Sequence, residues 1–113
     1  MIDVTTPATA SVVAAIPASA HTLFLEGTLA YFVDGQSPKL TVYDLADPRA
    51  PALQSELEVN GLLGFGFHDL HVSGGIAYLS AFLYGLVVVD CRTPTAPVEL
   101  GRTTQDPSYR YWH

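Results

Sequence analysis

The feature that most constrains this chain is a short motif that recurs along it. Leu40–Asp44 reads Leu-Thr-Val-Tyr-Asp and is followed by Pro48. Leu86–Asp90 reads Leu-Val-Val-Val-Asp and is followed at the same spacing by Pro94. Residues 3–7 carry the end of the same pattern, an Asp followed four residues later by a Pro. A sequence that repeats at a fixed period folds as a row of similar units, each burying its apolar surface against the next.

The similarity extends well beyond this motif. Residues 21–31 align with residues 68–78 at an offset of 47, and the offset falls to 46 at Asp44 and Asp90, so the second unit lacks one residue in the intervening turn. The alignment divides the chain into four parts. These are 1–20, the last strand of a preceding blade and a linker; 21–67, the first repeat; 68–112, the second repeat; and 113, the start of a next repeat.

The pattern within each repeat is that of β-strands. Short segments rich in Val, Leu, Tyr, Phe and Thr alternate with Gly, Pro, Asp and Ser, and no window combines a 3.6-residue period with helix caps. Four antiparallel strands in a unit of about 45 residues are typical of a β-propeller blade. We therefore predict an all-β fold of two four-stranded blades and one orphan strand, as part of a larger or oligomeric propeller. The predicted strands are 9–16, then 21–26, 28–34, 39–45 and 52–59, then 69–73, 75–81, 84–91 and 97–103.

The sequences of two strands predict which of their faces are buried. The third strand of the second repeat, Leu86–Val89, is apolar on both faces and should be buried on both. The fourth strand of the first repeat alternates, which predicts one buried and one solvated face. Its predicted buried face carries Leu53, Leu57 and Val59, and its predicted solvated face carries Gln54, Glu56 and Glu58.

The repeated aspartates have a structural interpretation. Asp44 and Asp90 can each accept a hydrogen bond from the backbone two residues on, which closes an Asx turn before Pro48 and Pro94. The alternative is a metal-binding or catalytic role. The structural role is preferred, because Asp often closes a turn in this way.

The ordered set of motifs resembles the LVIVD-repeat proteins. The resemblance rests on the two five-residue cores, the Ala-Tyr pairs at 30–31 and 77–78, and the Asp-x-x-x-Pro turns; the first core departs from it at Thr41 and Tyr43. It implies a β-propeller and, for most members, no assigned activity. Such proteins are often bacterial and exported or surface-associated, so an extracellular, cell-surface or periplasmic location is implied by the resemblance alone.

A propeller ring has about four to eight blades, and this chain supplies two. Two explanations follow: the chain is a fragment of a longer protein, or three or four copies assemble into a ring. The strand predicted at 9–16 could complete the sheet of a neighbouring copy.

The amino-acid composition excludes several classes of protein and partner. The 49% hydrophobic and 14% charged residues exclude intrinsic disorder. The net charge of −6 argues against nucleic acid as a partner, and no apolar run reaches the roughly 20 residues needed for a transmembrane helix.

Residues 11–20 could also be read as a signal peptide without its basic start, but the repeat alignment explains them as a strand. The single Cys91 is interpreted as a small apolar filler.

Three histidines, His21, His68 and His113, occupy the same repeat position at the start of the innermost strand. In a closed ring they would converge at the channel mouth, where imidazoles could hold a divalent metal or shuttle protons. The alternative is a hydrogen bond that fixes the turn into the first strand of every repeat. Asp69 and His71 share a face of the same strand and form a second candidate pair.

Aromatic residues near these histidines could bind a protein or a carbohydrate-like ligand. The candidates are Phe65, Phe67, Tyr109, Tyr111 and Trp112. In the alternative, Phe65 and Phe67 fill the space between blades and Trp112 begins the next core.

No reaction-specific motif occurs, and no cofactor is evident. The sequence therefore favours a binding or scaffolding module without catalytic activity. The alternative is a metal-dependent or hydrolytic propeller enzyme that uses the ring of histidines with Asp69 or His71.

Overall fold

The computed structural model describes residues 1–62 and 64–103. In this part of the chain the strands form two four-stranded antiparallel sheets and one two-stranded sheet, and the helical elements are two single 3₁₀ turns, η1 (Pro7–Thr9) and η2 (Phe82–Tyr84). The prediction of an all-β fold built from four-stranded blades is confirmed.

Each large sheet follows one repeat, and its strands pair in chain order. The first consists of β3 (Thr22–Glu26), β4 (Leu29–Val33), β5 (Lys39–Asp44) and β6 (Ala52–Glu58). The second consists of β7 (Asp69–Ser73), β8 (Ile76–Ser80), β9 (Leu86–Asp90) and β10 (Val98–Arg102). Every strand end in these sheets lies within two residues of its prediction.

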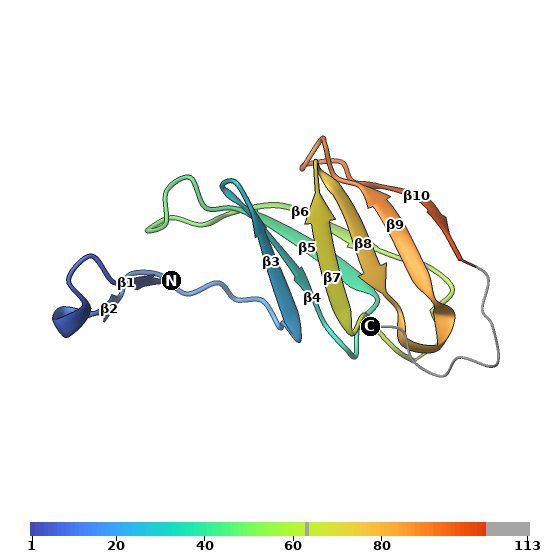
Figure 1. The fold of residues 1–113 in the computed structure, drawn as a ribbon, viewed down its shortest axis with the longest axis horizontal. Helices are drawn as coiled ribbons and strands as arrows, with labels where there is room; N and C mark the ends of the chain where they lie inside the picture. Colours follow the sequence, from blue (N-terminus) through green and yellow to red (C-terminus); the bar gives the residue numbers. More distant parts are fainter. Residues whose placement is uncertain (63, 104–113) are drawn as a thin grey trace.

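The N-terminal strand is shorter than predicted and has a partner. β2 (Ser11–Val12) pairs antiparallel with β1 (Ile2–Asp3), a strand that the sequence analysis did not identify. This small hairpin extends from the first sheet at one end of the molecule (Figure 1).

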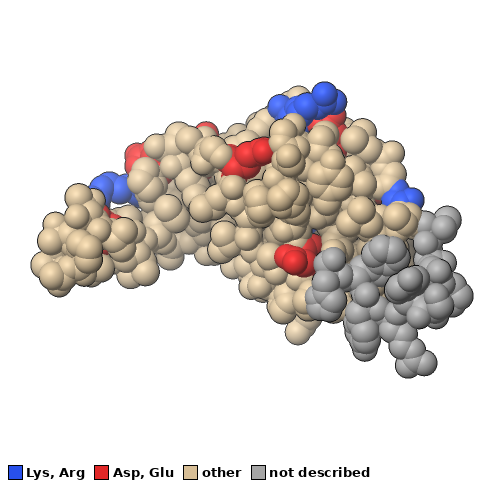
Figure 2. All heavy atoms as spheres, viewed as in Figure 1, with Lys and Arg blue, Asp and Glu red and all other residues tan. Residues whose placement is uncertain are grey.

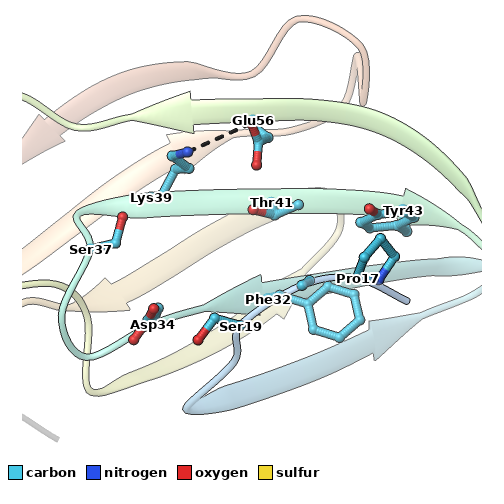
Figure 3. A pocket seen from close by; sticks show the side chains of 10 residues that line it. Pro17, Ser19, Phe32, Asp34, Ser37, Lys39, Thr41, Tyr43 and Glu56 are labelled. Atoms are coloured by element: carbon cyan, nitrogen blue, oxygen red, sulfur yellow. Dashed lines mark ion pairs between the residues drawn. The ribbon is translucent and has the colours of Figure 1, made fainter. Parts of the chain in front are cut away.

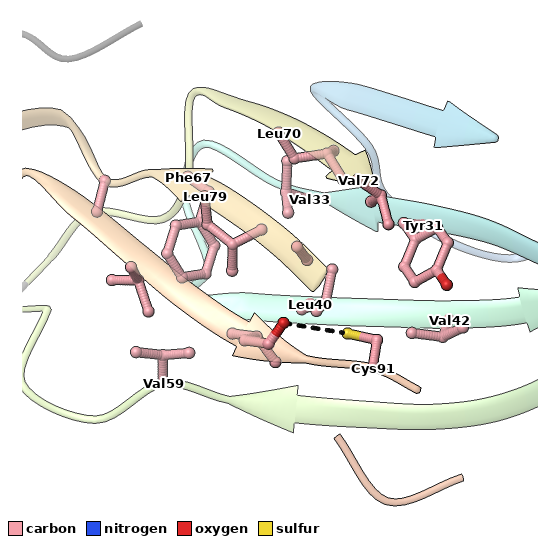
Figure 4. Close-up of a cluster of buried hydrophobic side chains, with 14 of the residues drawn as sticks. Tyr31, Val33, Leu40, Val42, Val59, Phe67, Leu70, Val72, Leu79 and Cys91 are labelled. Carbon is pink, nitrogen blue, oxygen red and sulfur yellow. Dashed lines mark hydrogen bonds between the residues drawn. The ribbon is translucent and has the colours of Figure 1, made fainter. Parts of the chain in front are cut away.

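The two large sheets pack face to face, and their first strands, β3 and β7, are neighbours (Figure 1). Thr22 Oγ1 donates a hydrogen bond to the backbone oxygen of His68 at 2.9 Å, which ties these strands together. One apolar core fills the space between the sheets (Figure 4). Its members include Tyr31, Val33, Leu40 and Val42 from the first sheet, Leu70, Val72, Ala77, Leu79, Val87 and Val89 from the second, and Val59, Leu62, Phe67, Ala81 and Cys91 from connecting segments.

The prediction for Leu86–Val89 is correct for one face only. Val87 and Val89 are buried between the sheets, whereas Leu86 and Val88 point to the other face and are half-buried. Within the described residues, the outer face of β9 is therefore partly open to solvent.

The prediction that Leu53 shares a buried face with Leu57 and Val59 is wrong. The pairing of β5 with β6 shifts by one residue, because Val42 lies opposite Ser55 but Tyr43 lies opposite Leu53. A bulge of this kind moves every following side chain to the other face. Leu53 is consequently 52% exposed, whereas Val59 is buried.

Asx turns close all three copies of the repeated motif. The carboxylates of Asp3, Asp44 and Asp90 accept the backbone N–H two residues on, at 2.9, 2.8 and 3.0 Å respectively. The repeated Asp therefore ends one strand and starts the turn that leads to the Pro.

Charged side chains are few on the face shown in Figure 2, and where a blue side chain appears at the top and at the left end, a red one lies beside it, so no patch of a single sign forms on this face. The described residues also contain no helix long and apolar enough to cross a membrane.

Candidate functional site at the start of the inner strands

The repeat histidines of the described chain meet where the inner strands begin. His21 precedes β3, His68 precedes β7, and their ring centroids lie 4.9 Å apart at an interplanar angle of 57°. Their backbone N–H groups make equivalent hydrogen bonds of 2.8 Å, from His21 to the oxygen of Val33 and from His68 to the oxygen of Ser80. The backbone thus fixes both residues at the same place in the two repeats.

Two phenylalanines extend this pair into a row of aromatic rings. The ring of Phe82 stands edge-on to His68 at 5.1 Å, and the ring of Phe65 lies 6.0 Å from that of Phe82. We refer to His21, His68, Phe82 and Phe65 as the aromatic row. His21 and Phe65, at its two ends, are exposed, whereas His68 and Phe82 are half-buried.

Phe82 was not among the residues singled out from the sequence. It lies in η2, in the turn that is one residue shorter in the second repeat, and its φ of +45° is the only positive value among the described residues that are not glycine. A bulky side chain rarely adopts this conformation, so the tight turn holds Phe82 in place. The change of offset from 47 to 46 is the sequence signal that marks this turn as different.

Asp69 and His71 lie beside a shallow hollow of about 190 Å³ on the outer face of the second sheet. In the register of β7 with β8, Asp69 lies opposite Ser80 and His71 lies opposite Tyr78. The Asp69 carboxylate accepts the backbone N–H of Leu70 at 2.8 Å, and the His71 ring stands edge-on to Phe24 at 4.9 Å. His71 therefore packs against the first repeat as well as lying at the rim of the hollow.

Phe67 does not join this surface. Phe67 is completely buried in the core between the sheets and offers no surface to a ligand. Its backbone N–H donates to the oxygen of Asp34 at 2.8 Å, which joins the segment before β7 to the turn after β4. The remaining candidates, His113, Tyr109, Tyr111 and Trp112, lie outside the described residues.

A second hollow, of about 180 Å³, lies on the opposite face of the first sheet and was not anticipated from the sequence (Figure 3). The segment 17–19 crosses over this face, and the side chains of Phe32, Thr41 and Tyr43 form its floor. At its edge Lys39 Nζ pairs with a Glu56 carboxylate oxygen at 3.6 Å. No single motif marks this hollow, because its residues come together only through cross-strand pairing.

Cys91 offers no reactive thiol. Its side chain is buried in the core, and burial, followed by the nearby carboxylates of Asp90 and Glu26, raises the pKa of the thiol to about 11. The thiol is therefore protonated at neutral pH and behaves as an apolar group.

Among residues 1–62 and 64–103, no group of three or more His, Cys, Asp or Glu side chains is arranged to hold a metal ion. His21 and His68 contribute two imidazoles to this surface. The ring of Phe82 packs against that of His68.

A comparison with protein families accounts for the second sheet. Residues 67–105, which begin just before β7 and continue past β10, match the model of the LVIVD repeat. This stretch is an LVIVD repeat. In it the Leu-Val-Val-Val-Asp core forms β9, and the Asp closes the turn into β10. The chain matches no curated protein.

The LVIVD repeat also helps to interpret the first sheet. The first sheet has the same strand order, the same Asx turn and an equivalent histidine. The two sheets are thus successive units of one propeller-like architecture, and the aromatic row lies where their inner strands begin.

Proposed function

We propose that this chain is a non-catalytic binding and scaffolding module, and that the aromatic row binds a short apolar segment of a partner protein. The observation that carries this proposal is the continuity of the row. Successive ring centroids lie 4.9, 5.1 and 6.0 Å apart, and Phe65 at its end is 43% exposed.

The chemistry of the row supports a peptide ligand. Aromatic rings that present both an apolar face and a polar edge contribute much of the energy at protein interfaces, because they bury a large area at a low cost in side-chain entropy. The exposed imidazole of His21 adds hydrogen-bonding atoms that can orient a peptide backbone.

The position of the row also supports binding. His21 and His68 are held at the ends of paired strands, and Phe82 lies in the tight η2 turn. Phe65 precedes Gly66, whose backbone N–H donates to the oxygen of Gly35 at 2.9 Å, so the geometry of the row is largely set before a ligand arrives. A site that is already organised loses less entropy on binding. The absence of a reaction-specific motif from the sequence agrees with binding rather than catalysis.

The proposal is tested by selecting a phage-displayed random peptide library on immobilised wild-type chain, with a glycan array probed in parallel. We expect the wild-type chain to enrich apolar or aromatic peptides and the Phe65→Ala variant to bind them at least tenfold more weakly. Leu100→Ala is the matched control, because Leu100 is a similarly exposed apolar residue on β10. Equal binding by the wild type and Phe65→Ala, or binding to glycans alone, would overturn the proposal.

A further inference from the structure

The core between the two sheets joins two different surfaces. We call the side of a repeat that faces the following repeat its forward face, and the side that faces the preceding repeat its rear face. In the first repeat the forward face carries Tyr31, Val33, Leu40 and Val42. In the second repeat the rear face carries Leu70, Val72, Ala77, Leu79, Val87 and Val89. The contact is therefore head-to-tail, between unlike faces of similar units.

The rear face occurs a second time, on the first repeat, where the linker residues Ile16 and Ala18 pack over Ala30, Phe32 and Tyr43 and only the β3 side is open. Leu23 and Leu25 of β3 are the equivalents of Leu70 and Val72 at the offset of 47. Leu70 and Val72 are 6% and 3% exposed, whereas Leu23 and Leu25 are 55% and 57% exposed. The same apolar positions are thus covered in one repeat and uncovered in the other.

The forward face also occurs twice. Tyr78 of β8 is the equivalent of Tyr31, and Val88 of β9 is the equivalent of Val42 at the offset of 46. Tyr31 is completely buried, whereas Tyr78 is 38% exposed and Val88 is half-buried. The exposed or half-buried positions Leu23, Leu25, Tyr78 and Val88 are therefore the equivalents of positions that are buried in the interface between the two repeats.

The linker before each repeat strengthens this comparison. Leu62, in the linker before the second repeat, is buried between the two sheets. In the linker before the first repeat, Ile16 and Ala18 pack on the rear face of that repeat, against Phe32 and Tyr43. The first repeat thus already carries the linker part of an interface, but the described chain supplies no blade to complete it.

We propose that the open rear face of the first repeat is covered by the forward face of the second repeat of another copy of this chain. The contact would repeat the internal one, with Tyr78 and Val88 of one copy packed against Leu23 and Leu25 of the next. A head-to-tail contact of this kind closes into a ring when the rotation between units allows it.

This inference does not depend on the proposed peptide site. It rests on faces of the sheets that the aromatic row does not use.

The test blocks one face at a time. Leu25→Arg places a charge on the rear face, and Tyr78→Arg places a charge on the forward face, both at exposed positions where the lone chain tolerates a change. Thr95→Arg, in the exposed turn after β9, is the matched control with the same added charge. The mass of each protein is measured by light scattering after gel filtration, with circular dichroism as a check on folding.

We expect the wild type and Thr95→Arg to form one discrete assembly, and Leu25→Arg and Tyr78→Arg each to be monomeric. An equimolar mixture of these two variants retains one unblocked rear face and one unblocked forward face, so it should form a dimer that grows no further. Leu23→Arg replaces Leu25→Arg if the latter fails to fold.

Three results would overturn the inference. The wild type could be a folded monomer at every concentration, either single variant could assemble as the wild type does, or the mixture could remain monomeric. Assembly by a variant alone would mean that like faces pair symmetrically.

Discussion

The carboxylate of Glu26, at the end of β3, accepts the backbone N–H groups of Gly74 and Gly75 at 2.7 and 2.9 Å. These glycines form the turn between β7 and β8 with φ values of +59° and +74°, and successive N–H groups in such a turn converge on an anion. A single side chain of the first repeat thus closes the end of the second. Sequence analysis gave no sign of this bond, because the partners are 48 and 49 residues apart.

Glu26→Ala should lower the free energy of unfolding by about 1–2 kcal/mol, because it leaves two backbone donors without their charged acceptor. The measurement is urea denaturation followed by circular dichroism. Glu58→Ala, at an exposed position at the end of β6, should change stability by less than about 0.5 kcal/mol. Equal effects of the two substitutions would show that Glu26 does not tie the repeats together.

Gly66→Ala should destabilise the chain strongly, by about 3 kcal/mol or more. Gly66 is buried, and a methyl group there would overlap the backbone oxygens of Asp34 and Ser37. Gly101→Ala is the control, because a methyl group at Gly101 meets no atom within 4 Å. Thermal melting of both variants gives the comparison, and a Gly66→Ala protein as stable as Gly101→Ala would contradict the close approach of the two loops.

Tyr31→Phe should stabilise the chain by about 1 kcal/mol. The hydroxyl of Tyr31 is buried in the core and has no hydrogen-bond partner in the described chain, and burial raises its pKa to about 12. Removing an unsatisfied polar atom relieves its cost of desolvation. Tyr78→Phe, at the exposed equivalent position, should have little effect in the same urea experiment; a loss of stability in Tyr31→Phe would mean that the hydroxyl is bonded.

Asp90 should make stability depend on pH in the acid range. The side-chain and backbone hydrogen bonds from Arg92 lower the pKa of Asp90 to about 2, from an ordinary value of 3.8. Because the pKa is lower in the folded chain, ionised Asp90 stabilises the fold above about pH 4, and this contribution is lost as the pH falls toward 2.

The measurement for Asp90 is the difference in unfolding free energy between the wild type and Asp90→Asn across this range. The difference should be present at pH 6 and vanish near pH 2. In an Arg92→Ala background the pH-dependent part of the difference should shrink. A difference that is unchanged between pH 6 and pH 2 would rule out the ionised Asp90–Arg92 pair as its source.

The strands could be predicted because Gly, Pro and Asp mark nearly every strand end, and each mark is local. The face assignment of Leu53 failed because a bulge depends on the partner strand, which a single strand does not reveal. The two faces of β9 differ for a similar reason, since burial of Leu86 and Val88 depends on what packs against the sheet.

The candidate site could be predicted only in part. The equivalence of His21 and His68 is visible in the repeat alignment, and the structure brings their rings together. Phe82 could not be identified in this way, because its place depends on a backbone conformation that its residue type disfavours. The burial of Phe67 agrees with the alternative interpretation of the sequence, in which this side chain fills the space between the blades.

The shortened η2 turn has a consequence for how such chains diversify. The loss of one residue leaves the pairing of β8 with β9 intact and yet brings a new aromatic ring beside His68. A turn of different length and sequence thus gives one repeat an aromatic ring that the equivalent turn of the other repeat lacks, while the paired strands on either side stay the same. The scaffold of such a unit is set by its strands, and its surface chemistry is set independently by its turns.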